Sequence, residues 1–278
     1  MPSDLGQSDL GKKIPYDPHY NKDKLFPILR SQLREDLGIH SSASLPFFGY
    51  DRFNHYEVSW LNEKGKPIAA SAEIIYPATS PYLLESKSLK LYFHSFNNTV
   101  FKEVRTLEEI VATDLSLCLE TEVNVKIMPS SEWHTPSIMA QFEEAICLDF
   151  LDVICSIYTL DPSTLRTEDP DVSETLYSDL LKSNCPVTGQ PDWGSICIRY
   201  TGQKIEHAGL LQYIVSYRNH NGFHEQCAEQ IFIDLMRFCH PKTLTVDLRY
   251  TRRGGIDINP YRSTDPTWTL PQTRLYRQ

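Results

Sequence analysis

The order of the hydrophobic patterns along this chain is the feature that most limits what it can fold into. Two strands, two helices and a third strand follow one another, at residues 56–60, 67–76, 89–100, 106–118 and 123–127. A turn at 62–65 joins the first two strands into a hairpin. Ser86 is the expected N-cap of the first helix, and Thr106 with Glu109 forms a capping box at the second. This half is therefore expected to hold a sheet backed by two helices.

The second half of the chain repeats this order. Two strands, two helices and two further strands are expected at residues 174–182, 196–200, 210–217, 228–239, 244–250 and 256–258. The repeat is one of architecture and not of obvious sequence identity. It predicts an α+β fold made of two tandem units, each an antiparallel sheet backed by a pair of helices.

The predicted domain boundaries follow from the stretches that lack periodicity. Residues 1–45 are polar, carry prolines and are interpreted as a loosely structured N-terminal arm. The first unit is then 46–150 and the second is 174–278. Residues 151–173 are assigned to a linker, because their acidic, proline-containing end is typical of one.

Charge and cysteine content narrow the class of partner and the compartment. The formal net charge is −9, whereas a protein that grips a nucleic-acid backbone usually needs a basic face. The sequence contains no apolar run of about 18 residues, so no membrane helix is predicted. The polar N-terminus does not resemble a signal peptide. Seven cysteines without a CxxC pair indicate reduced thiols. We expect a cytoplasmic protein that acts on a small molecule.

Several common signatures are missing from the sequence. There is no GxGxxG dinucleotide fingerprint and no GxxxxGK[ST] phosphate loop. The segment 224–228 begins like the HExxH zinc motif, but Ala228 stands where the second histidine is needed. A zinc protease is therefore rejected, and no metal site is expected.

The loop 183–194 is the most informative segment for chemistry. It carries Cys185 and, seven residues later, Asp192, and its two prolines and two glycines make it stiff. A thiolate placed on such a loop adds well to an electrophilic carbon, and a nearby carboxylic acid can supply a proton. From spacing alone, the better interpretation is still a packed loop thiol with Asp192 capping a turn.

Three further segments suggest binding. Glu85 to Lys90 opens a helix, and a helix N-terminus beside lysines suits an anionic cofactor. Phe223 can stack on a purine-like ring whose N–H edge Glu225 would read. Residues 252–255, Arg-Arg-Gly-Gly, can clamp a phosphate. The alternatives are a solvated lysine face, a glutamate that satisfies the helix dipole, and an ordinary surface hairpin.

Taken together, these segments resemble the QueF family, the nitrile reductases of queuosine biosynthesis. The stretch from Glu85 to Tyr92 is similar to the signature motif of the family. The other motifs follow in the order of the family, at Cys185-Pro186, Asp192-Trp193-Gly194, Phe223-His224-Glu225 and Arg252-Arg253-Gly254-Gly255. The resemblance spans roughly residues 45 to 278, and the length is that of the long, tandem subclass.

The resemblance implies two tandem tunnelling-fold units per chain, a homodimer, and a role in tRNA modification. The implied reaction reduces the nitrile of 7-cyano-7-deazaguanine to an aminomethyl group with two NADPH, through a covalent thioimide. Direct contact with nucleic acid or a membrane is not expected. The implied catalytic residues are Cys185, Asp192 and His224. The implied substrate contacts are Leu84, Glu85, Ser86, Phe223, His224 and Glu225. The implied cofactor contacts are Ser86, Lys87, Arg253 and Gly254, with Lys90 and Arg262 as weaker candidates.

Two other functions stay open at this point. One is a zinc-dependent tunnelling-fold hydrolase, such as a cyclohydrolase acting on a pterin or purine. The other is a purine-binding module without catalysis, which would not need a reactive Cys185.

Overall fold

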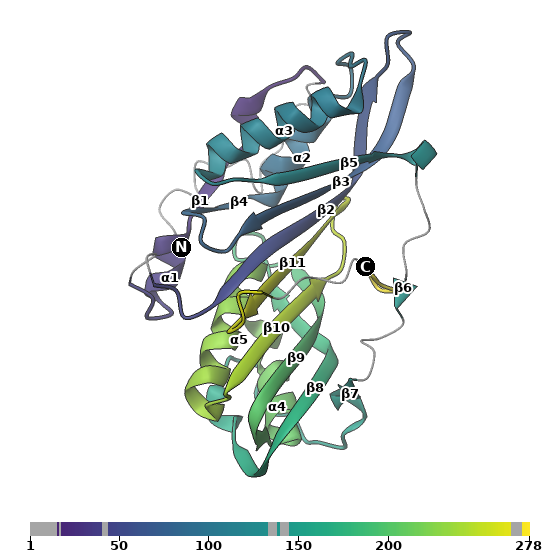
Figure 1. Ribbon diagram of the computed structural model, residues 1–278. Helices are drawn as coiled ribbons and strands as arrows, with labels where there is room; N and C mark the ends of the chain where they lie inside the picture. The colour runs from purple at the N-terminus through teal and green to yellow at the C-terminus, as the bar shows by residue number, and fades with distance from the viewer. Residues whose placement is uncertain (1–15, 17, 41–43, 133–137, 140–144, 268–273) are drawn as a thin grey trace. The chain divides into compact units, whose positions relative to one another are not determined.

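The structure is a computed structural model that describes residues 16, 18–40, 44–132, 138–139, 145–267 and 274–278. The chain forms two compact units (Figure 1). Unit 1 comprises Met1–Ala43, Tyr50–Thr135 and Arg252–Ile258, and unit 2 comprises Ser44–Gly49, Pro136–Thr251 and Asn259–Gln278. No helix in the described part of the chain is long and apolar enough to span a membrane.

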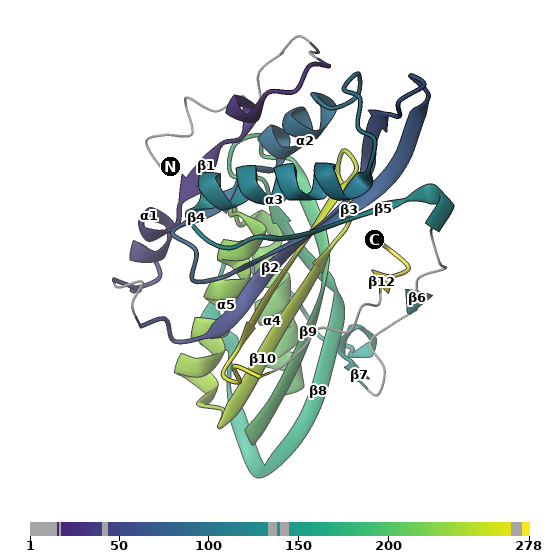
Figure 2. The same ribbon diagram turned by 45° about the horizontal axis from the view of Figure 1, so that its top comes forward.

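Unit 1 is an antiparallel sheet with helices packed on it (Figure 2). Its strands lie in the order β5, β3, β2, and the start of β11 lies beside β2, since the Tyr56 N–H donates to the Gly255 carbonyl at 2.8 Å. Two short strands, β1 and β4, form a separate antiparallel pair. The helices are α1 (Arg30–Glu35), α2 (Ser86–His94) and α3 (Val104–Leu119), with a 3-10 turn at Lys22–Lys24 and another at Ser130–Glu132. The strands are β1 (Pro27–Leu29), β2 (Phe48–Leu61), β3 (Pro67–Pro77), β4 (Tyr82–Leu84), β5 (Asn124–Pro129) and β11 (Ile256–Ser263).

The core of unit 1 explains why these segments take these shapes. Leu89, Phe93 and Phe96 recur at helical spacing and are almost fully buried. On β3, Ala70, Ala72, Ile74 and Tyr76 alternate with more exposed residues and enter the same core. Burial of these two apolar faces against each other fixes α2 and α3 on one side of the sheet.

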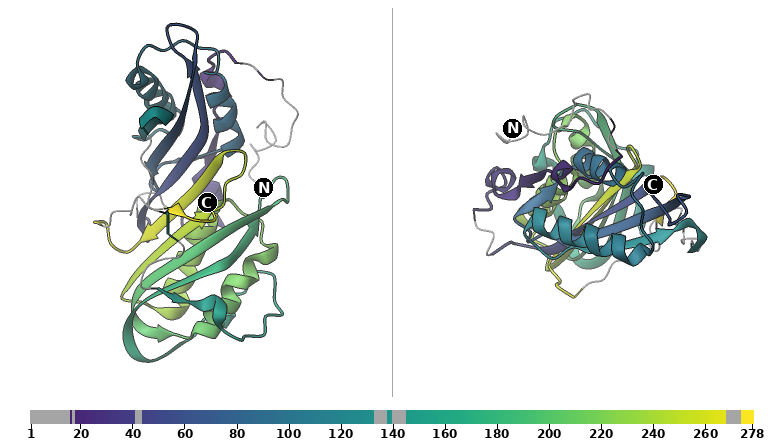
Figure 3. Two further views of the ribbon diagram at one scale, coloured as in Figure 1. Left: turned by 90° about the vertical axis from the view of Figure 1, so that its right-hand side faces the viewer. Right: turned by 90° about the horizontal axis from the view of Figure 1, so that it is seen from above.

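Unit 2 has the same plan, a sheet with two long helices on one face (Figure 3). The strand order is β11, β10, β9, β8, β7. The elements are β7 (Ile146–Cys147), β8 (Thr167–Asn184), β9 (Pro191–Ile205), α4 (His207–Ser216), α5 (His224–Cys239) and β10 (Thr243–Tyr250), with 3-10 turns at Leu148–Phe150, Pro162–Thr164 and Tyr217–Asn219. A separate parallel pair joins β6 (Ile138–Met139) to β12 (Arg274–Leu275). The expected α+β class is therefore confirmed.

The two helix pairs repeat one polar contact at matching positions. Tyr92, the seventh residue of α2, donates to Asp114, the eleventh residue of α3, at 2.7 Å. Tyr213, the seventh residue of α4, donates to Asp234, the eleventh residue of α5, at 2.6 Å. The repeat of architecture predicted from the sequence thus extends to individual buried side chains.

The structure differs from the predicted linker, because β8 already begins at Thr167. The acidic residues that suggested a linker instead pair with lysines of unit 2, one on β9 and one just before β10. Glu168 binds Lys204 at 2.8 Å, and Asp171 binds Lys242. A strand can therefore carry this acidic composition, since lysines of the same unit pair with its carboxylates.

Two other predicted boundaries also differ. Residues 252–258 belong to unit 1 and not to the second unit, because Asn54 and Tyr56 both donate to Asp257, each at 2.7 Å. The predicted arm holds β1 and α1, while residues 1–15, 17 and 41–43 of it lie outside the described residues. The second helix begins at Val104, not at Thr106, and Glu103 caps it without a side-chain hydrogen bond.

Candidate active site

Cys185 lies at the end of β8, in a tight turn that leads into β9. Its N–H donates to the Gln190 carbonyl at 2.9 Å, and its carbonyl accepts the Gly189 N–H at 3.0 Å. Gly189 has a φ of +65°, a conformation that glycine adopts without strain. Cys185 is partly exposed in this turn.

The residue before the cysteine ties this turn to the start of α5. The Asn184 N–H donates to the His220 carbonyl at 2.8 Å, and the Asn184 carbonyl accepts the Gly222 N–H at 3.1 Å. Two backbone hydrogen bonds therefore hold the segment that enters α5 against the end of β8. This bridge brings Cys185 and His224, far apart in the sequence, into one region of unit 2.

An acid and an imidazole meet in that region. Asp192, near the start of β9, is buried, and its Oδ2 lies 3.4 Å from Nε2 of His224, the first residue of α5. The imidazole stacks flat on Tyr250, with ring centroids 3.7 Å apart and planes 9° apart. A partly exposed thiol, a buried carboxyl and an imidazole thus lie around one loop, which is the set needed for nucleophilic addition with proton transfer.

The two predicted base-reading residues lie at the same helix start. Phe223 is the N-cap of α5 and is partly exposed, whereas Glu225 is only 2% exposed. A buried carboxylate beside a partly exposed aromatic ring suits a flat heterocycle with N–H groups on one edge.

Four of the other six cysteines are less suited to nucleophilic chemistry. All seven lie in the described part of the chain, and all are free. Burial raises the pKa of Cys118 to about 11 and the pKa of Cys197, Cys227 and Cys239 to about 12. These four thiols stay protonated near neutral pH, so they are poor nucleophiles.

The second predicted constellation lies in unit 1, around the start of α2. Glu85, not Ser86, is the N-cap, and its carboxylate accepts the N–H groups of Lys87 at 2.8 Å and Ser88 at 2.7 Å. Burial raises the pKa of Glu85, although these two N–H groups lower it. The Glu85 carboxylate therefore already accepts two of the free N–H groups at the start of α2. An anionic cofactor would contact mainly side chains here, because fewer N–H groups are left.

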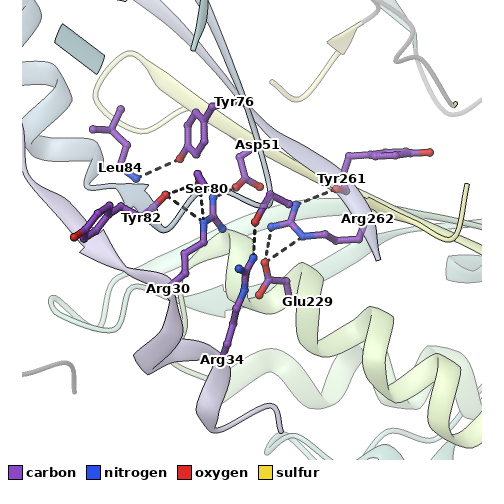
Figure 4. Close-up of polar contacts among 11 residues, drawn as sticks. Arg30, Arg34, Asp51, Tyr76, Ser80, Tyr82, Leu84, Glu229, Tyr261 and Arg262 are labelled. Atoms are coloured by element: carbon purple, nitrogen blue, oxygen red, sulfur yellow. Dashed lines mark hydrogen bonds and ion pairs between the residues drawn. The ribbon is translucent and has the colours of Figure 1, made fainter. Parts of the chain in front are cut away.

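Glu85 is held from the strand before it. The N–H of Leu84 donates to the Tyr76 hydroxyl at 3.2 Å, as Figure 4 shows. On β1's side of the same unit, Arg30 binds Asp51 and the Tyr82 carbonyl (Figure 4). These contacts fix β4, which delivers Leu84 and Glu85 to the start of α2.

A glycine turn of unit 1 adds the other predicted cofactor residues. A Cβ on Gly254 would lie 2.6 Å from Nζ of Lys90, and a Cβ on Gly255 would lie 2.5 Å from the carboxyl carbon of Glu57. The Arg253 N–H closes the turn on the Ile256 carbonyl at 3.0 Å. Lys90 therefore lies directly against the Gly254 backbone, and a side chain at position 254 would displace its ammonium group.

The structure separates the predicted residues into two groups. Cys185, Asp192, Phe223, His224 and Glu225 belong to unit 2. The signature residues and the glycine turn belong to unit 1, namely Leu84, Glu85, Ser86, Lys87, Lys90, Arg253 and Gly254.

Arg262 is not available as a cofactor contact of the kind expected. Its side chain is fully buried in unit 2, and Nη2 lies 2.8 Å from Oε1 of Glu229 (Figure 4). A buried guanidinium that is engaged by a carboxylate has a structural role. Among the described residues, no group of three or more His, Cys, Asp or Glu side chains can hold a metal ion.

Two parts of the chain match protein families. Residues 16–127 match "Nitrile reductase, 7-cyano-7-deazaguanine-reductase N-term", and residues 191–267 match "QueF-like protein". A protein of Legionella pneumophila named "NADPH-dependent 7-cyano-7-deazaguanine reductase" is 56% identical over 98% of this chain and 95% of its own length. A Coxiella burnetii protein of the same name is 52% identical, over 98% of this chain and 97% of its own length.

The chain belongs to the QueF family. The N-terminal QueF match contains the segment from Glu85 to Lys90, and the second match contains Asp192, His224 and Gly254. Cys185 falls between the two matches but within the length aligned to the relatives. A solved structure of the archaeosine synthase QueF-Like aligns with 37% of this chain and 100% of its own, at 17% identity and a TM-score of 0.31.

Sequence reasoning missed two neighbours of these QueF residues. Tyr250 was expected only as a strand residue, yet it stacks on His224. Glu57 on β2 contacts the Gly255 turn, although about 200 residues separate them. No local spacing signals either contact, since each depends on which strands become neighbours in a sheet.

Proposed function

We propose that this chain reduces the nitrile of 7-cyano-7-deazaguanine to an aminomethyl group with NADPH. The observation that carries the proposal is the contact between Asp192 and His224 at 3.4 Å, beside the turn that presents Cys185. The curated relatives, which align with nearly the whole chain, carry the name of this reaction.

Cys185 is the proposed nucleophile. Its sulfur attacks as the thiolate and forms a bond to the nitrile carbon, one π bond of the nitrile opens, and the nitrogen takes a proton from Asp192. The product is a thioimide on Cys185. His224, next to Asp192, returns a proton to the carboxylate, so that Asp192 can act again.

NADPH, when bound, would supply the hydride for each of two successive reductions at carbon. The chain must meanwhile release the Cys185 sulfur after the first hydride arrives, leaving an imine, and must protonate nitrogen again after the second. The complete reaction consumes one nitrile, two NADPH and two protons, and it yields one primary amine and two NADP⁺.

The residues of unit 1 fit an anionic dinucleotide. Ser86, Lys87 and Lys90 place a hydroxyl and two cationic side chains at the start of α2. The bare backbone of Gly254 lies against Lys90, and Arg253 is the residue before it. Two lysines and an arginine suit the phosphates of NADPH.

Recognition of the base is assigned to a second set of residues. Glu225 and Glu85 are each 2% exposed, so either carboxylate can accept hydrogen bonds from a purine-like N–H edge in an environment poor in water. Phe223 covers the ring face, and Leu84 and Ser86 flank Glu85.

The setting we propose is a cytoplasmic homodimer acting in queuosine biosynthesis, with no direct contact to nucleic acid or membrane. Seven free thiols support a reducing compartment. Light scattering coupled to gel filtration measures the assembly directly, and a monomer under assay conditions would overturn that part of the proposal.

Intact-protein mass spectrometry tests the reaction class. Wild type mixed with 7-cyano-7-deazaguanine, without NADPH, should gain the mass of the substrate, and Cys185→Ala should not. Cys155→Ala is the matched control, because Cys155 is also a partly exposed free thiol of unit 2.

The outcomes separate the candidate functions. An adduct on wild type and on Cys155→Ala, followed by release of the amine when NADPH is added, supports the reductase. Binding of the base without any adduct supports a purine-binding module. Activity that is lost with a chelator and restored by zinc supports a hydrolase.

A further inference from the structure

The imidazole of His224 lacks the support that usually orients a histidine in an active site. Such a ring is commonly held by a hydrogen bond at the nitrogen that does not face the chemistry. Here Nδ1 is buried, and it has no hydrogen-bond partner among the described residues. The other nitrogen, Nε2, lies a rather long 3.4 Å from Asp192. Hydrogen bonds alone therefore leave the plane of the ring poorly defined.

Tyr250 supplies the missing constraint. It is the last residue of β10, it is fully buried, and its ring lies 3.7 Å from that of His224 at an angle of only 9°. A flat, close stack of this kind fixes a plane even though it provides no directional bond. Burial also raises the pKa of Tyr250 well above its usual value, so the ring that faces His224 is a neutral phenol.

Gly194 makes room for this stack. It lies directly opposite Tyr250 in the pairing of β9 with β10. A Cβ at position 194 would lie 3.2 Å from Cδ1 and 3.3 Å from Cε1 of Tyr250. Those distances are shorter than ordinary van der Waals contact, so a methyl group there would force the ring to shift by a few tenths of an ångström. The glycine that follows Asp192-Trp193 therefore permits the position of the ring.

The hydroxyl of Tyr250 is not what the stack depends on. It lies near the buried thiol of Cys227 and the hydroxyl of Ser183, and neither of those groups belongs to the proposed chemistry. The ring, in contrast, touches a residue of the proposed proton relay. A phenylalanine would keep the stack, whereas a small aliphatic residue would remove it.

We infer that Tyr250 is a positioning residue for His224, and that Gly194 acts through Tyr250. This inference rests on the proposed reductase function. The aromatic face of Tyr250 holds the imidazole so that Nε2 points at Asp192, and the carboxyl is thereby kept ready to give and regain its proton.

Steady-state kinetics of Tyr250→Phe and Tyr250→Val provide the first test. The phenylalanine variant should keep the wild-type kcat. The valine variant should lose kcat by roughly 10- to 100-fold, the effect expected of a misplaced catalytic group, while KM for the nitrile stays nearly unchanged. Leu248→Ala is the matched control, because Leu248 is a fully buried residue of the same strand. Its cavity should lower Tm without lowering kcat.

A double-mutant cycle tests the role of Gly194. Gly194→Ala should lower kcat on its own, because the new methyl group displaces the ring. In the Tyr250→Val background the same change should have little further effect, since the ring is gone. Additive losses would show that Gly194 does not act through Tyr250.

A spectroscopic readout keeps the inference separate from the proposed function. The ring protons of isotopically labelled His224 should be shifted upfield by the Tyr250 ring current in wild type and in Tyr250→Phe. That shift should vanish in Tyr250→Val, and it should be smaller in Gly194→Ala, which gives the readout if the valine variant does not fold. If the His224 protons are shifted upfield but the wild-type protein has no reductase activity, only the reductase proposal is overturned. An active wild type with equal kcat in the phenylalanine and valine variants, or with no upfield shift, would overturn the role of Tyr250.

Discussion

The Tyr213 hydroxyl donates a hydrogen bond of 2.6 Å to the Asp234 carboxylate, and this contact joins α4 to α5 in the unit that carries Cys185. Both side chains are buried. Burial raises the pKa of Asp234, and the hydrogen bond from Tyr213 opposes that shift. The hydrogen bond therefore offsets part of the free-energy cost of burying the Asp234 carboxyl group between two helices.

Removing that hydroxyl should destabilise the protein. We expect Tyr213→Phe to lower the free energy of unfolding by about 1–3 kcal/mol, because it leaves a buried acceptor with fewer partners. Tyr276→Phe is the control, since Tyr276 is 65% exposed. Urea unfolding monitored by fluorescence measures both changes, and equal midpoints for the two variants would contradict this account.

The pH dependence of stability should report on His55 in unit 1. Burial lowers the pKa of His55 from 6.5 to about 4, and the hydrogen bond to the Gly255 carbonyl opposes this shift only in part. The ring is fully buried and packs against Phe93. The unfolded chain therefore binds a proton near pH 6.5 and the folded chain does so only near pH 4. The stabilisation from the neutral ring is complete above pH 6.5 and is lost as the pH falls toward 4, by about 3 kcal/mol in total.

Unfolding free energies at pH 7.5, 5.5 and 4.0 measure this dependence. His55→Gln should flatten the curve between pH 6.5 and 4 relative to wild type, whatever its stability at neutral pH. His40→Gln should leave the slope unchanged, because His40 is exposed. A His55→Gln curve parallel to wild type would mean that another group causes the acid sensitivity.

The order of strands and helices was predictable because it depends on local periodicity. The spacing of Leu89, Phe93 and Phe96 within one short segment predicts a helix, and the three side chains enter the core as expected. The start of β8 was not predictable in this way. Glu168 and Asp171 are typical of a linker, and only the fold brings Lys204 and Lys242 close enough to pair with them.

The same distinction holds for the candidate site. Cys185 and Asp192 lie on one loop, so the sequence could suggest them together. Their approach to His224 depends on the backbone bridge from Asn184 to residues 220–222, which no side-chain pattern encodes. Tyr250 reaches His224 only because β10 pairs with β9, and that pairing is a property of the whole sheet.

The glycine turn offers a test of the proposed cofactor contacts. Gly254 has a φ of +55°, and a Cβ there would collide with Lys90. Gly254→Ala should raise KM for NADPH by roughly tenfold, the loss of one charge-assisted contact. Gly65→Ala is the matched control, since Gly65 has a φ of +73° with nothing within 4 Å of its missing Cβ. Both variants carry similar backbone strain, so equal KM values would show that Lys90 does not hold the cofactor.

Glu85 and Glu206 allow the capping role of a glutamate to be separated from a role in binding. Glu85 caps α2, accepting the N–H groups of Lys87 and Ser88, and Glu206 caps α4 in unit 2 by accepting the Gly209 N–H at 3.0 Å. Either change to alanine should lower the free energy of unfolding by about 0.5–2 kcal/mol through the lost cap.

Their effects on activity should differ. Glu85→Ala should also raise KM for the nitrile, because its buried carboxylate is proposed to read the base, while Glu206→Ala should leave kcat/KM close to wild type. Steady-state kinetics beside thermal unfolding measures both quantities on the same preparations. If the two variants lose stability and activity in equal proportion, Glu85 is a helix cap alone, and recognition of the base must come from Glu225.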